Sequence, residues 1–281
     1  MEDSYLWSLT EPLGHVPNGF PADGAKGTHG PRLMTETLMP GGGVARRPLH
    51  FIVIADCSGS MKGEKMQALN YALRSMLPHL VDWERDQLQA QLLIRILAFA
   101  SAPHWFVPDP VPVAHLSARW RNLEYVPMGR TNMGPAFRAV AEVLSPDRLE
   151  RRALRPAILL VTDGLPTDPP GGFESGLASL LEIAAGRSAL RLAVAIGRDA
   201  NSEPLDRFRS PDVPVLVADG TDEIADRLVT ASIAVSRMSE IGVDRGALAE
   251  QLNLAEPARR SQPEVPAAEG GGQDGYFEDI L

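Results

Sequence analysis

The chain has 281 residues, of which 44% are hydrophobic, and a formal net charge of −9. This length predicts one large domain with tails, or two domains, and the acidic excess argues against a nucleic-acid surface, because phosphate binding needs clustered Lys and Arg. Cys57 is the single cysteine, which excludes an intrachain disulfide and fits a reducing compartment.

Residues 1–47 predict an N-terminal extension that is partly loop. "GFPADGAKGTHGP" and "PGGG" are typical of loops or linkers, and "RLMTETLM" (Arg32–Met39) is compatible with a short strand. The first twenty residues lack the basic start and apolar centre of a secretory signal, and no apolar run approaches the length of a membrane span. We therefore expect a cytoplasmic protein that does not contact a membrane.

Residues 48–238 alternate between strand and helix patterns. "LHFIVIA" (Leu49–Ala55) is a short apolar run, as in a strand buried on both faces. Apolar residues recur at helical spacing from about residue 63 to residue 77, and Pro78 is expected to end that helix. Further strands are expected at 91–100, 157–162, 191–197 and 213–218, edge strands at "HWFV" and "VPVAHL", and helices around 137–144, around 177–184 and from Thr221.

This alternation predicts an α/β fold, with a doubly wound, mostly parallel sheet flanked by helices. Ligands bind such a sheet beyond the carboxyl ends of its strands, where the strand order switches. Residues 239–281 predict a short helix at "VDRGALAEQLNL" and then a flexible acidic tail that ends in "YFEDIL". We expect a frayed tail there, with a docking peptide as the alternative.

Three oxygen-bearing side chains, Asp56, Ser58 and Ser60, follow the first buried strand in "ADCSGSMKGEK". A phosphate loop is excluded, because Gly59 and Gly63 are one residue too close and an acidic residue replaces the required lysine. A nucleophile elbow needs glycines on both sides of its serine, and a phosphoaspartyl site needs a second carboxylate where Ser58 stands. Cys57 has no evident partner base, and a helix cap explains only one of the serines.

A metal site explains all three residues, because hard cations such as Mg²⁺ take oxygen ligands in an octahedral shell. One loop cannot fill that shell, so two further strand-end loops should contribute. Candidates are "GRTN", with Thr131 and Asn132, and "VTDG", with Asp163.

"DCSGS", "GRTN" and "VTDG", in this order, resemble the metal-ion-dependent adhesion site (MIDAS) of von Willebrand factor A (vWA) domains. The resemblance covers about residues 48–238 and implies the Rossmann-like vWA fold, with an N-terminal extension before it and the tail after it. It is nearest to the bacterial TerY-like subfamily. The metal ligand positions that it implies are Asp56, Ser58, Ser60, Thr131 and Asp163.

Three of these five positions are neutral hydroxyls, so a bound cation would keep Lewis acidity and an open position for a carboxylate of another protein. No positioned general base is visible, since Asp168 is best explained as a turn residue before Pro169. We therefore predict a non-enzymatic protein-binding adaptor that uses Mg²⁺, with Mn²⁺ or Ca²⁺ as alternatives. The resemblance implies kinase and phosphatase partners in bacterial stress response or defence. The alternatives are a metal-dependent phosphohydrolase and an adaptor subunit of a ring ATPase.

Overall fold

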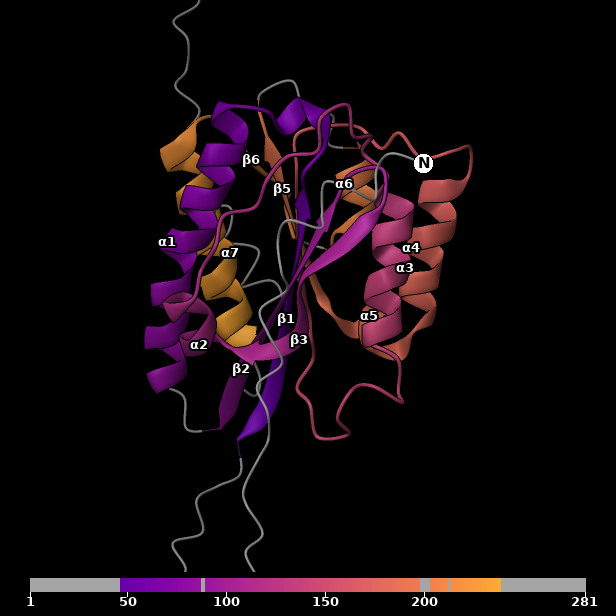
Figure 1. Cartoon of the computed structure of the whole chain (residues 1–281). Helices are drawn as coiled ribbons and strands as arrows, with labels where there is room; N and C mark the ends of the chain where they lie inside the picture. Colours follow the sequence, from indigo (N-terminus) through magenta and orange to yellow (C-terminus); the bar gives the residue numbers. More distant parts are fainter. Residues whose placement is uncertain (1–45, 87–88, 198–202, 212, 239–281) are drawn as a thin grey trace, which may run out of the picture.

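A six-stranded sheet in the order β3-β2-β1-β4-β5-β6 forms the middle layer of the protein (Figure 1). The computed structural model describes residues 46–86, 89–197, 203–211 and 213–238, so the predicted strand at 32–39 and the predicted helix and tail after residue 238 lie outside the described residues. All neighbouring strands are parallel except β3, which pairs antiparallel with β2 at the edge. The strands are β1 (Arg47–Asp56), β2 (Ala90–Phe99), β3 (Pro103–Pro112), β4 (Ala157–Thr162), β5 (Leu190–Ile196) and β6 (Leu216–Ala218).

Helices cover both faces of the sheet, as predicted for a doubly wound fold (Figure 1). Phe51 and Val53 of β1 pack with α1, α2 and α7, whereas Ile52 and Ile54 pack with α3, α4 and α6 on the other face. This alternation follows from the two-residue period of a strand, and burial of both faces explains the continuous apolar runs. The helices are α1 (Glu64–Asp86), α2 (Val113–Ala118), α3 (Met133–Val143), α4 (Gly172–Glu182), α5 (Ala184–Ser188), α6 (Glu203–Phe208) and α7 (Thr221–Met238).

The expected end of the first helix at Pro78 is wrong, because α1 continues to Asp86 with Pro78 inside it. An internal proline removes one backbone hydrogen bond and costs about 3 kcal/mol. Leu77 and Leu80 are each only 1% exposed, so the helical path buries apolar side chains on both sides of the proline. Burial of each leucine contributes roughly 1.5–3 kcal/mol, which offsets the lost hydrogen bond.

Three other segments also differ from the expected elements. Of the strand predicted at 213–218, only Leu216–Ala218 (β6) is a strand. The predicted edge strand at "VPVAHL" reaches only Pro112, where β3 ends, and Val113 begins α2. Val113 and Leu116 are fully buried three residues apart, a spacing that a helix places on one face. The helix predicted around 177–184 is interrupted at Ile183, whose backbone is extended, so α4 and α5 are separate. Within the described ranges, no helix is both long and apolar enough to cross a membrane.

The strand order switches direction at β1. The chain passes from β1 to β2 on one side and later adds β4 on the other side, so a crevice is expected between the carboxyl ends of β1 and β4. Asp56 is the last residue of β1, and Asp163 directly follows β4. The fold therefore brings the first and last of the predicted metal positions to the same edge.

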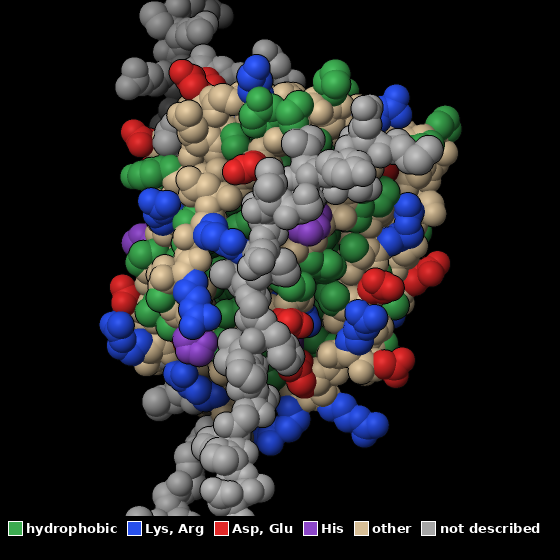
Figure 2. All heavy atoms as spheres, viewed as in Figure 1, with side chains coloured by type: hydrophobic (Ala, Val, Ile, Leu, Met, Phe, Trp, Pro, Cys, Tyr) green, Lys and Arg blue, Asp and Glu red, His purple; other side chains and the backbone are tan. Residues whose placement is uncertain are grey.

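Charge is spread unevenly over the surface. Figure 2 shows Lys and Arg side chains gathered on the left of the visible face, where α1 and α2 lie in Figure 1. Exposed Arg74 lies on α1, and exposed Arg119 and Arg121 follow α2. This side is thus locally basic, although the whole chain has a net charge of −9.

Candidate metal centre

Asp56 is a carboxylate buried at the end of β1. Its exposed fraction is 0%, and its two oxygens have different donors. The backbone N–H of Ser58 donates to Oδ1 at 2.8 Å, and the hydroxyl of Thr162 donates to Oδ2 at 2.6 Å. Burial nevertheless raises the pKa of Asp56, and the charge of nearby Asp163 adds to the effect. A cation beside this carboxylate would offset the cost of keeping it ionised.

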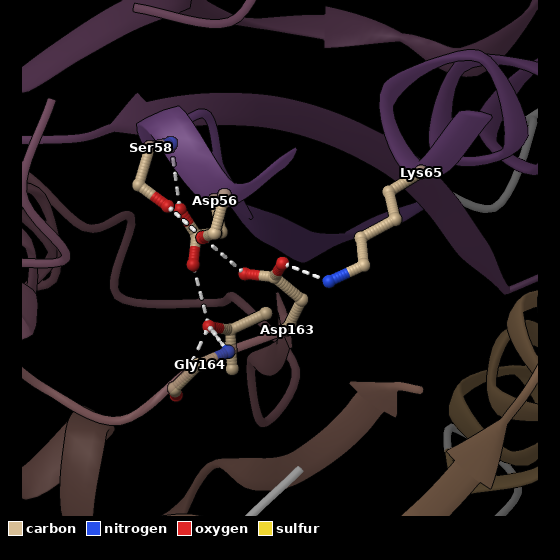
Figure 3. A network of polar contacts seen from close by, with 7 residues as sticks. Asp56, Ser58, Lys65, Asp163 and Gly164 are labelled. Atoms are coloured by element: carbon tan, nitrogen blue, oxygen red, sulfur yellow. Dashed lines mark hydrogen bonds and ion pairs between the residues drawn. The ribbon is translucent and has the colours of Figure 1, made fainter. Parts of the chain in front are cut away.

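Ser58, Ser60 and Asp163 form a chain of hydrogen bonds next to Asp56 (Figure 3). The Ser60 hydroxyl donates to Asp163 Oδ1 at 2.8 Å, and the two serine oxygens are 3.0 Å apart. The hydroxyl of Ser58 also interacts with the Asp56 carboxylate and lowers its pKa, so Ser58 contacts both Asp56 and Ser60. The alternating positions in "DCSGS" thus put their oxygens on the side that faces Asp163.

Thr131 comes from a third loop, just before α3, and is only 6% exposed. Its Oγ1 would lie 3.8 Å from a Cβ placed on Gly164, so the hydroxyl faces the loop that carries Asp163. The two loops are also joined directly: Thr131 N–H donates to Thr167 Oγ1 at 2.8 Å, and Thr167 N–H donates to the Thr131 carbonyl at 2.9 Å. All five predicted positions are therefore brought to one edge of the sheet.

Asp168 holds the start of α3 and is not placed as a general base. Its two carboxylate oxygens accept the backbone N–H groups of Met133 and Gly134, at 2.9 and 2.8 Å. These are amides of the first helical turn, which lack partners within the helix, and the negative charge complements the helix dipole. The expected local turn role is thus not the one observed: Asp168 caps the start of α3 across about 35 residues of sequence, and in doing so it anchors the loop of Thr131.

Cys57 points away from the centre, as expected for a small side chain tucked beneath the loop. It is 0% exposed and belongs to the core cluster under α1. Burial raises the pKa of its thiol, with a further contribution from the charge of Asp56, so a thiolate nucleophile is disfavoured.

The donor set fits a hard divalent cation. Two carboxylates and three hydroxyls supply only oxygen, which suits Mg²⁺, Mn²⁺ or Ca²⁺ chemically. Within the described part of the chain, no three His, Cys, Asp or Glu side chains gather in a way that could hold a metal ion. A metal at this edge would therefore depend on the hydroxyls of Ser58, Ser60 and Thr131 as well as on the two aspartates.

Sequence reasoning missed two residues that touch the aspartates. Thr162 is the hydrogen-bond donor to Asp56 described above, and it directly precedes Asp163 in "VTDG". Lys65 lies in the first turn of α1, and its Nζ is 2.5 Å from Asp163 Oδ2 (Figure 3). Lys65 lies in "ADCSGSMKGEK" and Thr162 lies in "VTDG", so their places in these two motifs are what could have drawn attention to them. The spacing of the residues does not predict either contact.

Comparison with known proteins shows the fold more clearly than the family. No protein-family model matches the chain. It is similar to an uncharacterized protein of Mycobacterium tuberculosis, Rv2850c, with 27% identity over 134 residues, which are 46% of this chain and 20% of that protein.

Solved structures are similar over the domain. Proximal thread matrix protein 1 from the mussel byssus has 16% identity and a TM-score of 0.53, over 68% of this chain and 48% of that one. The same mussel protein was also solved with its MIDAS motif occupied by zinc, and that structure has a TM-score of 0.52. A von Willebrand factor type A protein from Catenulispora acidiphila has 15% identity and a TM-score of 0.47, over 66% of this chain and 43% of that one.

Together with the sheet order, the likeness to the mussel protein shows that this chain has the Rossmann-like α/β fold of vWA domains. The matched region spans about a fifth of the mycobacterial protein and less than half of each of these solved chains.

Proposed function

We propose that this chain is a non-enzymatic module that binds another protein through a divalent cation. The observation that carries the proposal is the hydrogen-bonded chain from Ser58 through Ser60 to Asp163, set beside buried Asp56 at the switch point of the sheet. The residues that would hold the cation are Asp56, Ser58, Ser60, Thr131 and Asp163.

The charges of these residues favour binding of a carboxylate. Two aspartates at most balance a divalent cation, and the hydroxyls add no charge, so a bound cation supplies a Lewis-acidic position for an acidic side chain. Ser58 and Ser60 are linked by one hydrogen bond and Asp56 is fixed by two, so the oxygens would be largely ordered before the cation arrives. The partner class that fits is a protein that presents an Asp or Glu.

An open groove of about 790 Å³ supports binding of a polypeptide at this edge. It lies between α1 and residues 122–127, and its walls include Lys62, Tyr71, Arg74 and Tyr125. Lys62 and Gly63 line the groove and lie two and three residues after Ser60 in the chain, so the groove begins next to the first site loop. The residues that flank the partner's acidic side chain would lie in this groove, between its aromatic side chains (Tyr71, Tyr125) and its basic ones, such as Arg74.

A hydrolytic function is less well supported by the geometry of the same site. Both oxygens of Asp168 accept backbone amides, and Asp56 and Asp163 belong to the proposed cation shell, so none of the three is placed to take a proton from water.

We further propose Mg²⁺ as the physiological cation, a cytoplasmic setting, and a TerY-like role beside kinase and phosphatase partners in stress response. The TerY-like role and its partners rest on the sequence resemblance, Mg²⁺ rests on the oxygen-only donor set, and the cytoplasmic setting rests on the single cysteine, which fits a reducing compartment.

Calorimetric titration with Mg²⁺ and Mn²⁺ tests the proposal. We expect Ser60→Ala and Asp163→Asn to weaken metal binding at least tenfold, whereas Ser175→Ala, an exposed serine on α4, serves as the matched control and should leave it unchanged. Asp163→Asn with wild-type affinity would show that the site is wrongly assigned. Turnover of a phosphate ester by the purified chain, abolished by Asp56→Asn, would show that the module is an enzyme.

A further inference from the structure

Asp163 divides its two carboxylate oxygens between two kinds of partner (Figure 3). Oδ1 accepts the hydroxyl of Ser60 at 2.8 Å, on the side of the proposed cation, and Oδ2 lies 2.5 Å from the ammonium of Lys65. The Asp163 side chain is 0% exposed, whereas that of Lys65 is 42% exposed. A positive charge therefore stands at the rim of the centre, fixed to one of its two carboxylates.

The position of Lys65 is not explained by the helix that carries it. Lys65 is the second residue of α1, where the helix dipole presents positive charge and a lysine is unfavourable. The ion pair with Asp163 joins residues 98 positions apart, so it links α1 to the loop after β4. The contact that accounts for Lys65 is thus with the metal centre.

The net charge of the centre shows what Lys65 would do there. With Asp56 and Asp163 ionised, a divalent cation makes the centre neutral, and Lys65 then adds one positive charge. A neutral centre holds its cation tightly but attracts a carboxylate weakly. An extra positive charge does the reverse, because it repels the cation and attracts the partner's acidic group.

We propose that Lys65 tunes the centre for partner capture, by weakening the binding of the cation and strengthening the binding of a carboxylate to the cation-loaded protein. This inference rests on the proposed function. It goes further by assigning opposite effects on two binding steps to one residue outside the five ligand positions. Lys65 is a positioning residue here, since it acts through Asp163 and through its charge.

The test uses the whole chain with Lys65→Met, a variant that removes the charge and keeps most of the length of the side chain. Mn²⁺ affinity is measured by calorimetry, and carboxylate binding is measured from the relaxation of the acetate methyl protons in the Mn²⁺-loaded protein. We expect Lys65→Met to bind Mn²⁺ about tenfold more tightly and acetate several-fold more weakly. Lys65→Arg, which retains the charge, should restore both affinities toward those of the wild type.

Arg85→Met is the matched control, because it removes an equal charge from an exposed side chain in the last turn of the same helix, α1. It should change both affinities less than twofold. If Lys65→Met weakens both steps, the lysine only orients Asp163 and the inference is overturned; equal effects of Lys65→Met and Arg85→Met overturn it as well. A wild-type chain that binds no Mn²⁺ overturns the proposed function itself, which separates the two failures.

Discussion

Thr162→Val probes how the fold tolerates a buried carboxylate at the end of β1. Thr162 is 1% exposed and Asp56 is 0% exposed, and the hydroxyl of Thr162 donates to Asp56 Oδ2 at 2.6 Å. Valine has nearly the same shape as threonine, so the substitution leaves the packing in place. It removes the hydrogen bond to Asp56 and also the 3.2 Å bond in which Thr162 Oγ1 accepts the N–H of Gly164, and the double-mutant cycle below separates the two. Asp56 then keeps only partners from Ser58, namely its backbone N–H and its hydroxyl.

A hydrogen bond to a charged acceptor contributes about 1.5–3 kcal/mol, and no water replaces this donor easily at a fully buried site. We therefore expect Thr162→Val to lower the free energy of unfolding by about 2 kcal/mol at pH 7 without metal. Burial raises the pKa of Asp56, and the hydrogen bond from Thr162 is the largest influence that opposes this rise. Removing it should raise the pKa of Asp56 further.

The sign of the pH dependence follows from that pKa. A carboxyl group whose pKa is higher in the folded than in the unfolded chain reduces stability as the pH rises from the unfolded value of 3.8 through the folded value. The variant has the higher folded pKa, so its deficit against the wild type should be largest at neutral pH. It should shrink toward pH 4, where Asp56 becomes protonated in both proteins.

Urea unfolding from pH 7 to pH 4 measures this deficit. Thr230→Val on α7 is the matched control, because that hydroxyl bonds only to a helix carbonyl in an exposed position, and it should change stability by less than about 0.5 kcal/mol. A double-mutant cycle with Asp56→Asn isolates the pair. The reasoning is refuted if Thr162→Val loses less than about 0.5 kcal/mol, or if the loss is the same in the Asp56→Asn background.

Two further substitutions test the loops and helices that support the centre. A Cβ on Gly176 of α4 would lie 2.3 Å from the carbonyl oxygen of Gly134 in α3, so Gly176→Ala should destabilise the fold by about 1–3 kcal/mol in urea unfolding; a neutral effect would mean that the two helices separate freely. Met128 has φ = 56° and is 95% exposed, in a turn closed by a 3.0 Å hydrogen bond from Gly129 N–H to the Val126 carbonyl. Met128→Gly should therefore stabilise the protein by about 0.5–1 kcal/mol, seen as a higher Tm, and a lower Tm would show that the exposed side chain makes a stabilising contact.

The sequence was sufficient to predict the sheet because its strands are buried on both faces. Short apolar runs such as "HFIVIA" and "AILLVT" are typical of strands buried on both faces, and their alternation with helical periods predicts the fold class. Local rules failed where tertiary burial outweighed them. Pro78 lies inside α1 because the helical path buries Leu77 and Leu80. Val113 begins α2 instead of extending the edge strand, because a helix places the buried side chains of Val113 and Leu116 on one face.

The centre was predictable only in part, for a related reason. Asp56, Ser58 and Ser60 share one short motif, so their alternation is visible in the sequence, but Thr131 and Asp163 were assigned through resemblance to a known pattern. The contacts of Thr162 with Asp56 and of Lys65 with Asp163 join residues 106 and 98 positions apart. Nothing in the spacing of such residues encodes their approach, which is set by the order of the strands.

The three site loops are joined by backbone hydrogen bonds that do not use the proposed ligand side chains. Val126 N–H donates to the Cys57 carbonyl at 2.7 Å, and Gly59 N–H donates to the Gly129 carbonyl at 3.0 Å. Since a main-chain bond survives a side-chain substitution, Ser60→Ala should leave the loops in place and remove one oxygen with its hydrogen bonds to Ser58 and Asp163. Asp56 is different, because its buried carboxylate also accepts two hydrogen bonds, so its replacement alters the fold and the centre together. Loss of metal binding in Ser60→Ala is therefore the more direct measure of the centre, and loss in Asp56→Asn must be compared with the stability of that variant.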